Sequence, residues 1–221
     1  MTSTYQNSVD DSREANQSSK KKVWCLILAA GESTRMKQQK LLMPWNGKTV
    51  VETTIEKAMA SEADEVLVVT GSHRSEIESL LKPLDVKIVV NESYQDGMLS
   101  TVLCGIKTIP SAVDAVLVML GDQPMIQTSV INRIIEIHQK EGAKIILPVW
   151  EEKRGHPVLF DLQFREEMFG LKGNPGLREL LQRYPNDVKE LEVDTSEIVE
   201  DLDTQEDYQK LKDTYDEGKN G

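Results

Sequence analysis

Side chains that can bind a phosphate chain follow directly after the first apolar segment of the sequence. Residues 23–28 form a continuous apolar run, which is typical of a strand buried on both faces of a parallel sheet. Residues 29–31 are small, so a ligand can approach their backbone closely. Hydroxyl and basic side chains come next: Ser33, Thr34, Arg35, Lys37 and Lys40. Backbone N–H groups and cationic side chains of this kind bind phosphate oxygens.

Spacing alone leaves two interpretations of this loop open. It contains neither the G-x-x-x-x-G-K-[ST] motif nor the G-x-G-x-x-G motif. It is therefore either a different kind of phosphate-binding loop or an ordinary connection between a strand and a helix, with a solvated basic face.

A carboxylate lies at the end of another apolar run. Residues 115–120 predict a buried strand, and Gly121-Asp122-Gln123-Pro124 follows it. Ligands of open α/β sheets gather beyond the carboxyl ends of the strands. Mg²⁺ reaches proteins through one or two carboxylates plus phosphate oxygens. Asp122 is therefore a candidate metal ligand if it faces the basic loop, and otherwise a turn aspartate.

Three more polar positions have both a structural and a functional interpretation. Residues 91–101 end a strand and predict a helix that opens at Ser100 or Thr101, either as an N-cap or as a second ligand wall. His156 lies in a charged turn, where it would cap the next strand or contact a substrate. Thr204 is expected to cap the last helix, with Asp207 at its third position.

Strands and helices alternate along the chain. Apolar runs predict strands at 23–28, 65–70, 86–90, 115–120, 144–150 and 188–193, with a further strand within 154–160. Helical periodicity and caps predict helices at 49–60, 75–81, 102–108, 128–141 and 177–184, and residues 44–48 predict a turn. This alternation predicts an α/β fold with a mostly parallel sheet between helices.

Composition excludes several classes of protein. The 221 residues carry a formal net charge of −11, which argues against a nucleic-acid-binding protein. Residues 1–21 are polar and predict a flexible tail, which leaves 22–221 as one domain. Cys25 and Cys104 are expected to be free thiols in the cytoplasm. No apolar run is long enough for a membrane span, and the N-terminus lacks the apolar core of a signal peptide.

The basic loop resembles the signature of the MobA-like nucleotidyltransferases, L-A-A-G-x-S-x-R-M-x-x-x-K-L-L. Its two alanines are similar to the molybdenum cofactor cytidylyltransferase branch. The resemblance continues in order through residues 91–101, G-D-Q-P, R-G-H-P and L-D-T-x-E-D, and it covers about residues 23–212. Two positions depart from the family pattern, which usually has Gly in place of Lys37 and Asp in place of Asn174.

The resemblance implies roles for particular residues. Those implied to bind the nucleotide are Leu28, Ala29, Ala30, Gly31, Arg35, Lys40, Gly97, Ser100 and Thr101. Arg35 and Lys40 would hold the phosphates and act in catalysis together with Asp122. Asp122 and Asp203 would bind Mg²⁺, and Arg154 and His156 would face the second substrate.

The resemblance also implies a fold and an activity. The fold is a Rossmann-like three-layer α/β sandwich of the nucleotide-diphospho-sugar transferase type. The activity is Mg²⁺-dependent transfer of CMP from CTP to molybdopterin with release of pyrophosphate, in support of apo-enzymes of the xanthine dehydrogenase type. Three alternatives stay open: another phosphorylated acceptor, a non-catalytic maturation partner, and an oxidoreductase. The missing dinucleotide fingerprint weighs against the last of these.

Overall fold

The computed structural model describes residues 20–33, 36, 39–173 and 175–219, and for 215–219 the backbone alone. The flexible tail expected at 1–21 lies outside this part of the chain except for its last two residues. Arg35, Lys37 and Asn174 also lie outside it. Within the described residues, no helix is both long and apolar enough to span a bilayer.

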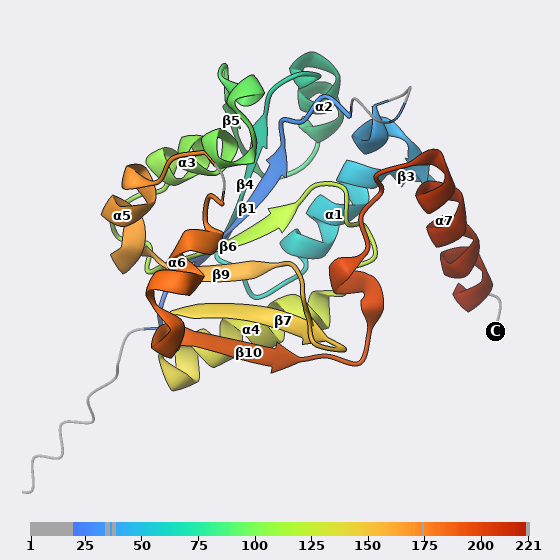
Figure 1. Cartoon of the computed structure of the whole chain (residues 1–221). Helices are drawn as coiled ribbons and strands as arrows, with labels where there is room; N and C mark the ends of the chain where they lie inside the picture. The colour runs from blue at the N-terminus through green and yellow to red at the C-terminus, as the bar shows by residue number, and fades with distance from the viewer. Residues whose placement is uncertain (1–19, 34–35, 37–38, 174, 220–221) are drawn as a thin grey trace, which may run out of the picture.

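An eight-stranded sheet runs through the centre of the molecule in the order β10-β7-β9-β6-β1-β4-β5, with β8 paired to β7 (Figure 1). Its strands are β1 (Val23–Ala29), β4 (Glu65–Thr70), β5 (Lys87–Val90), β6 (Ala115–Leu120), β7 (Ile145–Trp150), β8 (Lys153–Arg154), β9 (Val158–Asp161) and β10 (Val188–Glu192). The pairs β1–β4, β1–β6, β4–β5 and β7–β10 are parallel. The expected mostly parallel sheet is therefore confirmed.

The described residues form seven α-helices, of which α1 to α6 pack on the sheet. They are α1 (Val50–Met59), α2 (Arg74–Leu81), α3 (Met98–Thr108), α4 (Thr128–Glu141), α5 (Arg165–Gly170), α6 (Arg178–Arg183) and α7 (Gln205–Lys219). Short 3₁₀ turns lie at Lys40–Leu42, Tyr94–Asp96, Leu162–Phe164, Pro185–Asp187 and Ser196–Val199.

The two faces of the sheet bury separate apolar clusters. Helices α1, α2 and α4 pack on the face that receives Val23, Cys25 and Ile27 of β1. Helices α3, α5 and α6 cover the face that receives Trp24 and Leu26. Alternate residues of one strand thus enter opposite cores, as the pleat of a strand requires. The three-layer sandwich expected from the sequence is confirmed (Figure 1).

A third apolar cluster packs the C-terminal helix α7 against the hairpin that follows the small-residue loop. The hairpin of β2 (Pro44–Trp45) and β3 (Lys48–Thr49) occupies the stretch expected to be a turn. The ring of Trp45 meets that of Tyr208 on α7 edge-on at 6.1 Å. Thr204 and Asp207 exchange the hydrogen bonds of a capping box before α7, as the sequence predicts.

The predicted start of α3 was wrong. The helix begins at Met98, and Gly97 rather than Ser100 or Thr101 occupies the N-cap position. Gly97 has a φ of 93°, a left-handed conformation that glycine adopts without strain. The N-cap of the helix therefore lies three residues before Ser100, the first hydroxyl residue that was expected to cap it.

Candidate active site

One lysine amine lies between two carboxylates that are distant in sequence. Lys40 opens the 3₁₀ turn after the small-residue loop, Asp122 follows β6, and Asp203 precedes α7. Lys40 Nζ forms an ion pair with Asp122 Oδ2 and lies 3.2 Å from Asp203 Oδ1. The structure thus brings together three of the residues that the sequence singled out.

The two carboxylates keep the Lys40 amine charged although it is partly buried. Burial by itself lowers the pKa of the Lys40 amine, but the charges and hydrogen bonds of Asp122 and Asp203 outweigh it and raise the pKa above its usual value. Lys40 is therefore protonated at every physiological pH. Its positive charge stays available for negative groups that enter the site.

The neighbouring strands β1 and β6 determine where Asp122 lies. Leu28 and Leu120 are paired in the parallel register, and the Gly121 N–H donates to the Leu28 carbonyl at 3.0 Å. A Cβ atom at Gly121 would lie only 2.9 Å from that oxygen. The lack of a side chain at Gly121 therefore lets the Asp122 loop pass directly over the end of β1.

A third carboxylate, Asp201, belongs to the same cluster and was missed in the sequence. Gln123, which is 2% exposed, donates its Nε2–H to Asp201 Oδ1 at 2.7 Å. Desolvation and the nearby charges of Asp122 and Asp203 raise the pKa of Asp201. The sequence pattern that could have revealed it is acidic-apolar-acidic at residues 201–203. Leu202 is fully buried, so both of its acidic neighbours point to the opposite side.

The two residues expected to face the second substrate lie in different surroundings. His156 feels the charges of Asp122 and Arg178, and burial lowers its pKa to about 4, so its imidazole is neutral at physiological pH. Arg154 instead forms an exposed ion pair with Glu190 of β10, at 2.6 Å. The structure therefore places His156 near the carboxylates and directs Arg154 toward the edge of the sheet.

The described residues expected to line the nucleotide lie in two groups, which were expected to form the two walls of a ligand site. In one group, Asn91 Nδ2 donates to the hydroxyls of Ser100 and Thr101 at 2.9 and 3.1 Å. The Ser100 hydroxyl donates to the Gly97 carbonyl at 2.8 Å. This network fixes the turn before α3 and orients both hydroxyl groups.

The small-residue loop contains the other group. Ala29 and Ala30 are buried, Leu28 is half-buried and Gly31 is exposed. The Ser72 hydroxyl donates to the Gly31 carbonyl at 2.8 Å. A Cβ atom added at Gly31 would meet nothing within 4 Å among the described residues, which leave open space there.

The carboxylate oxygens beside Lys40 are suited to bind a hard divalent cation. One oxygen each of Asp122 and Asp203 lies within 3.2 Å of a single ammonium nitrogen, so the two oxygens face a common point. Oxygen donors of this kind suit Mg²⁺. No group of three or more His, Cys, Asp and Glu side chains suited to a metal occurs among the described residues, so water and a ligand would supply the other positions.

Comparison with known proteins identifies the family. Residues 25–188 match the model of the MobA-like NTP transferase domain. The chain belongs to the MobA-like NTP transferase family. A curated MobA-like relative, the molybdenum cofactor cytidylyltransferase of Escherichia coli strain K12, is 27% identical over 194 residues, which are 87% of this chain and 97% of the relative.

A second relative has a different activity in its name. The nicotine blue oxidoreductase of Paenarthrobacter nicotinovorans is also 27% identical, over 84% of this chain and 94% of its own. Among solved structures, Rv0371c of Mycobacterium tuberculosis H37Rv superposes with a TM-score of 0.80 at 26% identity, covering 88% of this chain and 99% of that one. A manganese complex of the same protein has a TM-score of 0.75 at 26% identity, covering 87% of this chain and 98% of that one. The chain thus shares the fold of Rv0371c over most of its length.

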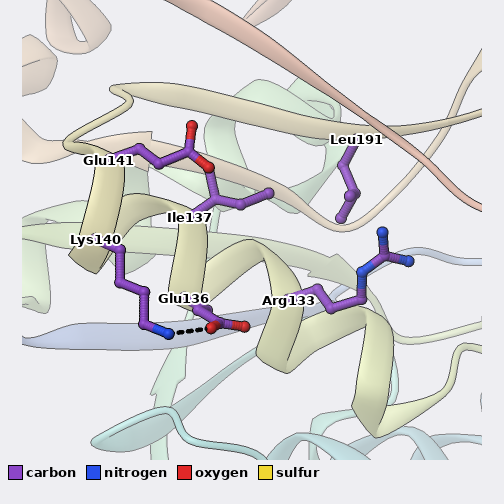
Figure 2. A pocket seen from close by; sticks show the side chains of 6 residues that line it. All are labelled: Arg133, Glu136, Ile137, Lys140, Glu141 and Leu191. Carbon is purple, nitrogen blue, oxygen red and sulfur yellow. Dashed lines mark hydrogen bonds and ion pairs between the residues drawn. The ribbon is translucent and has the colours of Figure 1, made fainter.

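A cavity of about 220 Å³ lies elsewhere, between α4 and β10 (Figure 2). Its charged side chains are engaged with one another, with the nearby Lys189 or with the backbone. Lys140 pairs with Glu136, Glu141 pairs with Lys189, and Arg133 donates to the Glu192 carbonyl. None of the residues predicted to bind or react lines this cavity.

Proposed function

We propose that this member of the family transfers CMP from CTP to molybdopterin and releases pyrophosphate. The observation that carries the proposal is the meeting of Lys40 with Asp122 and Asp203 beside the small-residue loop. A cation and two carboxylates at the carboxyl ends of parallel strands suit a triphosphate with its metal ion.

Nucleotidyl transfer needs positioning and charge neutralisation more than it needs covalent chemistry. An oxygen of the acceptor phosphate attacks the α-phosphorus, and the bond from that phosphorus to the pyrophosphate oxygen breaks. Lys40 donates hydrogen bonds to the leaving pyrophosphate, and we assign Arg35 the same task. The acceptor phosphate is already ionised at neutral pH, so the site needs no strong general base.

Asp122 and Asp203 would hold Mg²⁺ in this reaction. When bound, the ion would neutralise charge on the triphosphate and polarise its phosphorus atoms. The neutral imidazole of His156 would lie on the acceptor side, where it donates or accepts a hydrogen bond without adding charge. We keep Arg154 as a proposed acceptor contact, although it pairs with Glu190 in this structure.

The choice of CTP and molybdopterin is supported by similarity along nearly the whole length of the Escherichia coli cytidylyltransferase. We place the reaction in the cytoplasm, and its product would serve apo-enzymes of the xanthine dehydrogenase type. Transfer to another phosphorylated acceptor, or a non-catalytic role in cofactor maturation, would use the same residues.

An oxidoreductase is the second candidate, because the nicotine blue oxidoreductase has the same 27% identity. The sequence contains no G-x-G-x-x-G motif after its first strand, so the usual fingerprint for a dinucleotide cofactor is missing. We therefore rank this candidate below nucleotidyl transfer.

A panel of pyrophosphate-release assays tests the proposal. CTP, GTP, ATP and UTP are each supplied with Mg²⁺, with and without molybdopterin. We expect pyrophosphate only when CTP and molybdopterin are both present. Pyrophosphate release from another triphosphate would show that the enzyme uses a different base. Release with a different phosphate ester in place of molybdopterin would show that it uses a different acceptor. NAD(P)H oxidation without any pyrophosphate would favour the oxidoreductase.

A further inference from the structure

A buried hydroxyl on α1 contacts the backbone that carries Asp122. Thr54 is 1% exposed, and no role in binding or catalysis has been assigned to it. Its hydroxyl lies 3.2 Å from the carbonyl oxygen of Gly121, a residue 67 positions away in the sequence. It also lies 3.1 Å from the carbonyl oxygen of Val50, one turn earlier in its own helix.

The orientation of the Gly121 carbonyl directly constrains the backbone of Asp122. The Gly121 C=O group and the Asp122 N–H group belong to one planar peptide unit. A hydrogen bond that holds this oxygen therefore limits rotation of the whole plane, and with it the direction in which the Asp122 side chain leaves the backbone.

We propose that Thr54 is a positioning residue that keeps the Asp122 carboxylate aimed at Lys40. The inference rests on the proposed function, because it concerns the site in which Asp122 would act. Thr54 itself lies beneath the loop and touches no substrate.

The other described backbone contacts of the loop act on different peptide units. The Gly121 N–H donates to the Leu28 carbonyl at 3.0 Å, which fixes the peptide unit before Gly121. Lys57, one turn after Thr54 on α1, donates to the Met125 carbonyl at 3.0 Å and fixes the far end of the loop. The Thr54 contact acts between these two, on the peptide unit that leads into Asp122.

A purely structural role makes a different prediction. Threonines in helices commonly donate to the carbonyl four residues earlier, and Thr54 has one proton for two acceptors. If the proton serves Val50 alone, removal of the hydroxyl changes the stability of the helix and leaves the orientation of Asp122 unchanged.

Three variants separate these roles. Thr54→Val replaces the hydroxyl by a methyl group of similar size, and Thr54→Ser restores a hydroxyl. Thr53→Val is the matched control, because the Thr53 hydroxyl donates only within the helix in the described contacts, to the Thr49 carbonyl at 3.0 Å. All are assayed well below their melting temperatures.

We expect Thr54→Val to lower kcat about tenfold while KM for CTP changes less than about twofold, because a small misplacement of a reacting group lowers the rate without preventing binding. Thr54→Ser should regain most of the wild-type kcat, and Thr53→Val should match the wild type. A Thr54→Val enzyme with the kcat of Thr53→Val would overturn the proposal.

Two measurements do not depend on turnover. Loss of the hydrogen bond should move the carbonyl ¹³C resonance of Gly121 upfield in Thr54→Val and leave it unchanged in Thr53→Val. Binding of Mn²⁺, followed by electron paramagnetic resonance, should be weaker in Thr54→Val than in the control. Unchanged resonance and unchanged Mn²⁺ binding would refute the positioning role.

These measurements also test the role of Thr54 separately from the proposed function. A wild-type protein that transfers no nucleotide refutes the proposed function, while the resonance and Mn²⁺ binding still decide the role of Thr54. If Thr54→Val does not fold, Thr54→Ala takes its place in the same measurements.

Discussion

At the scale of single residues, two carboxylates share one amine. Lys40 is drawn toward Asp122 and Asp203, and its raised pKa keeps it charged. A triphosphate that enters would offer this amine further acceptors, because its phosphate oxygens are also negatively charged. The same amine would then stabilise the charge that develops on pyrophosphate.

Replacement of Lys40 tests this role. We expect Lys40→Met to lower kcat/KM by about 10²- to 10³-fold, the usual loss when one group that stabilises transition-state charge is removed. Lys48→Met is the control, since Lys48 is an exposed lysine on the adjacent hairpin and pairs with Glu56. Pyrophosphate release from CTP is the measurement. Equal activity of the two variants would show that Lys40 does not act on the phosphates.

The sequence predicted residues at this scale only where a motif carried them. Lys40, Asp122 and Asp203 lie together in the structure, whereas Asp201 escaped notice because an acidic residue in an acidic segment looks like ordinary solvated surface. The prediction for Arg154 came from its neighbour in the R-G-H-P motif. Arg154 and His156 are two residues apart, but Arg154 lies in the short strand β8 and pairs with Glu190, whereas His156 follows that strand and lies near Asp122.

At the scale of elements, strands were predicted well because apolar runs mark them directly. The direction of a strand within the sheet is harder to predict. Strand β9 runs antiparallel to β6 and β7 and separates the parallel strands, but its apolar pattern is the same in either direction. The start of α3 was missed for a local reason, since a glycine with positive φ replaced the expected hydroxyl cap.

Helix α4 contains a buried histidine that should make stability depend on pH. His138 is fully buried; its Nδ1 contacts the Ala143 carbonyl at 2.8 Å, while Nε2 has no partner among the described contacts. Burial lowers its pKa, and the charge of Lys21 lowers it further, against the hydrogen bond to Ala143 and the carboxylates Asp114 and Asp161. The folded state therefore binds this proton more weakly than the unfolded chain.

The sign of the effect follows from linkage. Because the pKa is lower in the folded state, the contribution of His138 is complete above the unfolded value of 6.5 and is lost as pH falls from there through the folded pKa. We expect the free energy of unfolding to fall less steeply in His138→Asn than in the wild type between about pH 8 and pH 5. Denaturant titrations at several pH values measure it, and parallel curves would contradict the assignment.

At the scale of the whole molecule, three separate parts of the chain meet at one place. The loop after β1 supplies Lys40, the end of β6 supplies Asp122, and the segment before α7 supplies Asp203. The backbone N–H of His156 donates to the Ile198 carbonyl at 2.9 Å and guides this last segment across the sheet. Local patterns in the sequence cannot reveal such a meeting, because it depends on contacts between distant residues.

The most direct test of this account is Mg²⁺-dependent release of pyrophosphate from CTP, with molybdopterin as acceptor, by the wild type and by Asp122→Ala. We expect the wild type to release pyrophosphate only when Mg²⁺ is present. Asp122→Ala should release none, and its circular dichroism spectrum should match that of the wild type, since Asp122 lies in a loop at the end of β6. Normal turnover by Asp122→Ala would contradict the central claim that this carboxylate and Lys40 form the reacting site.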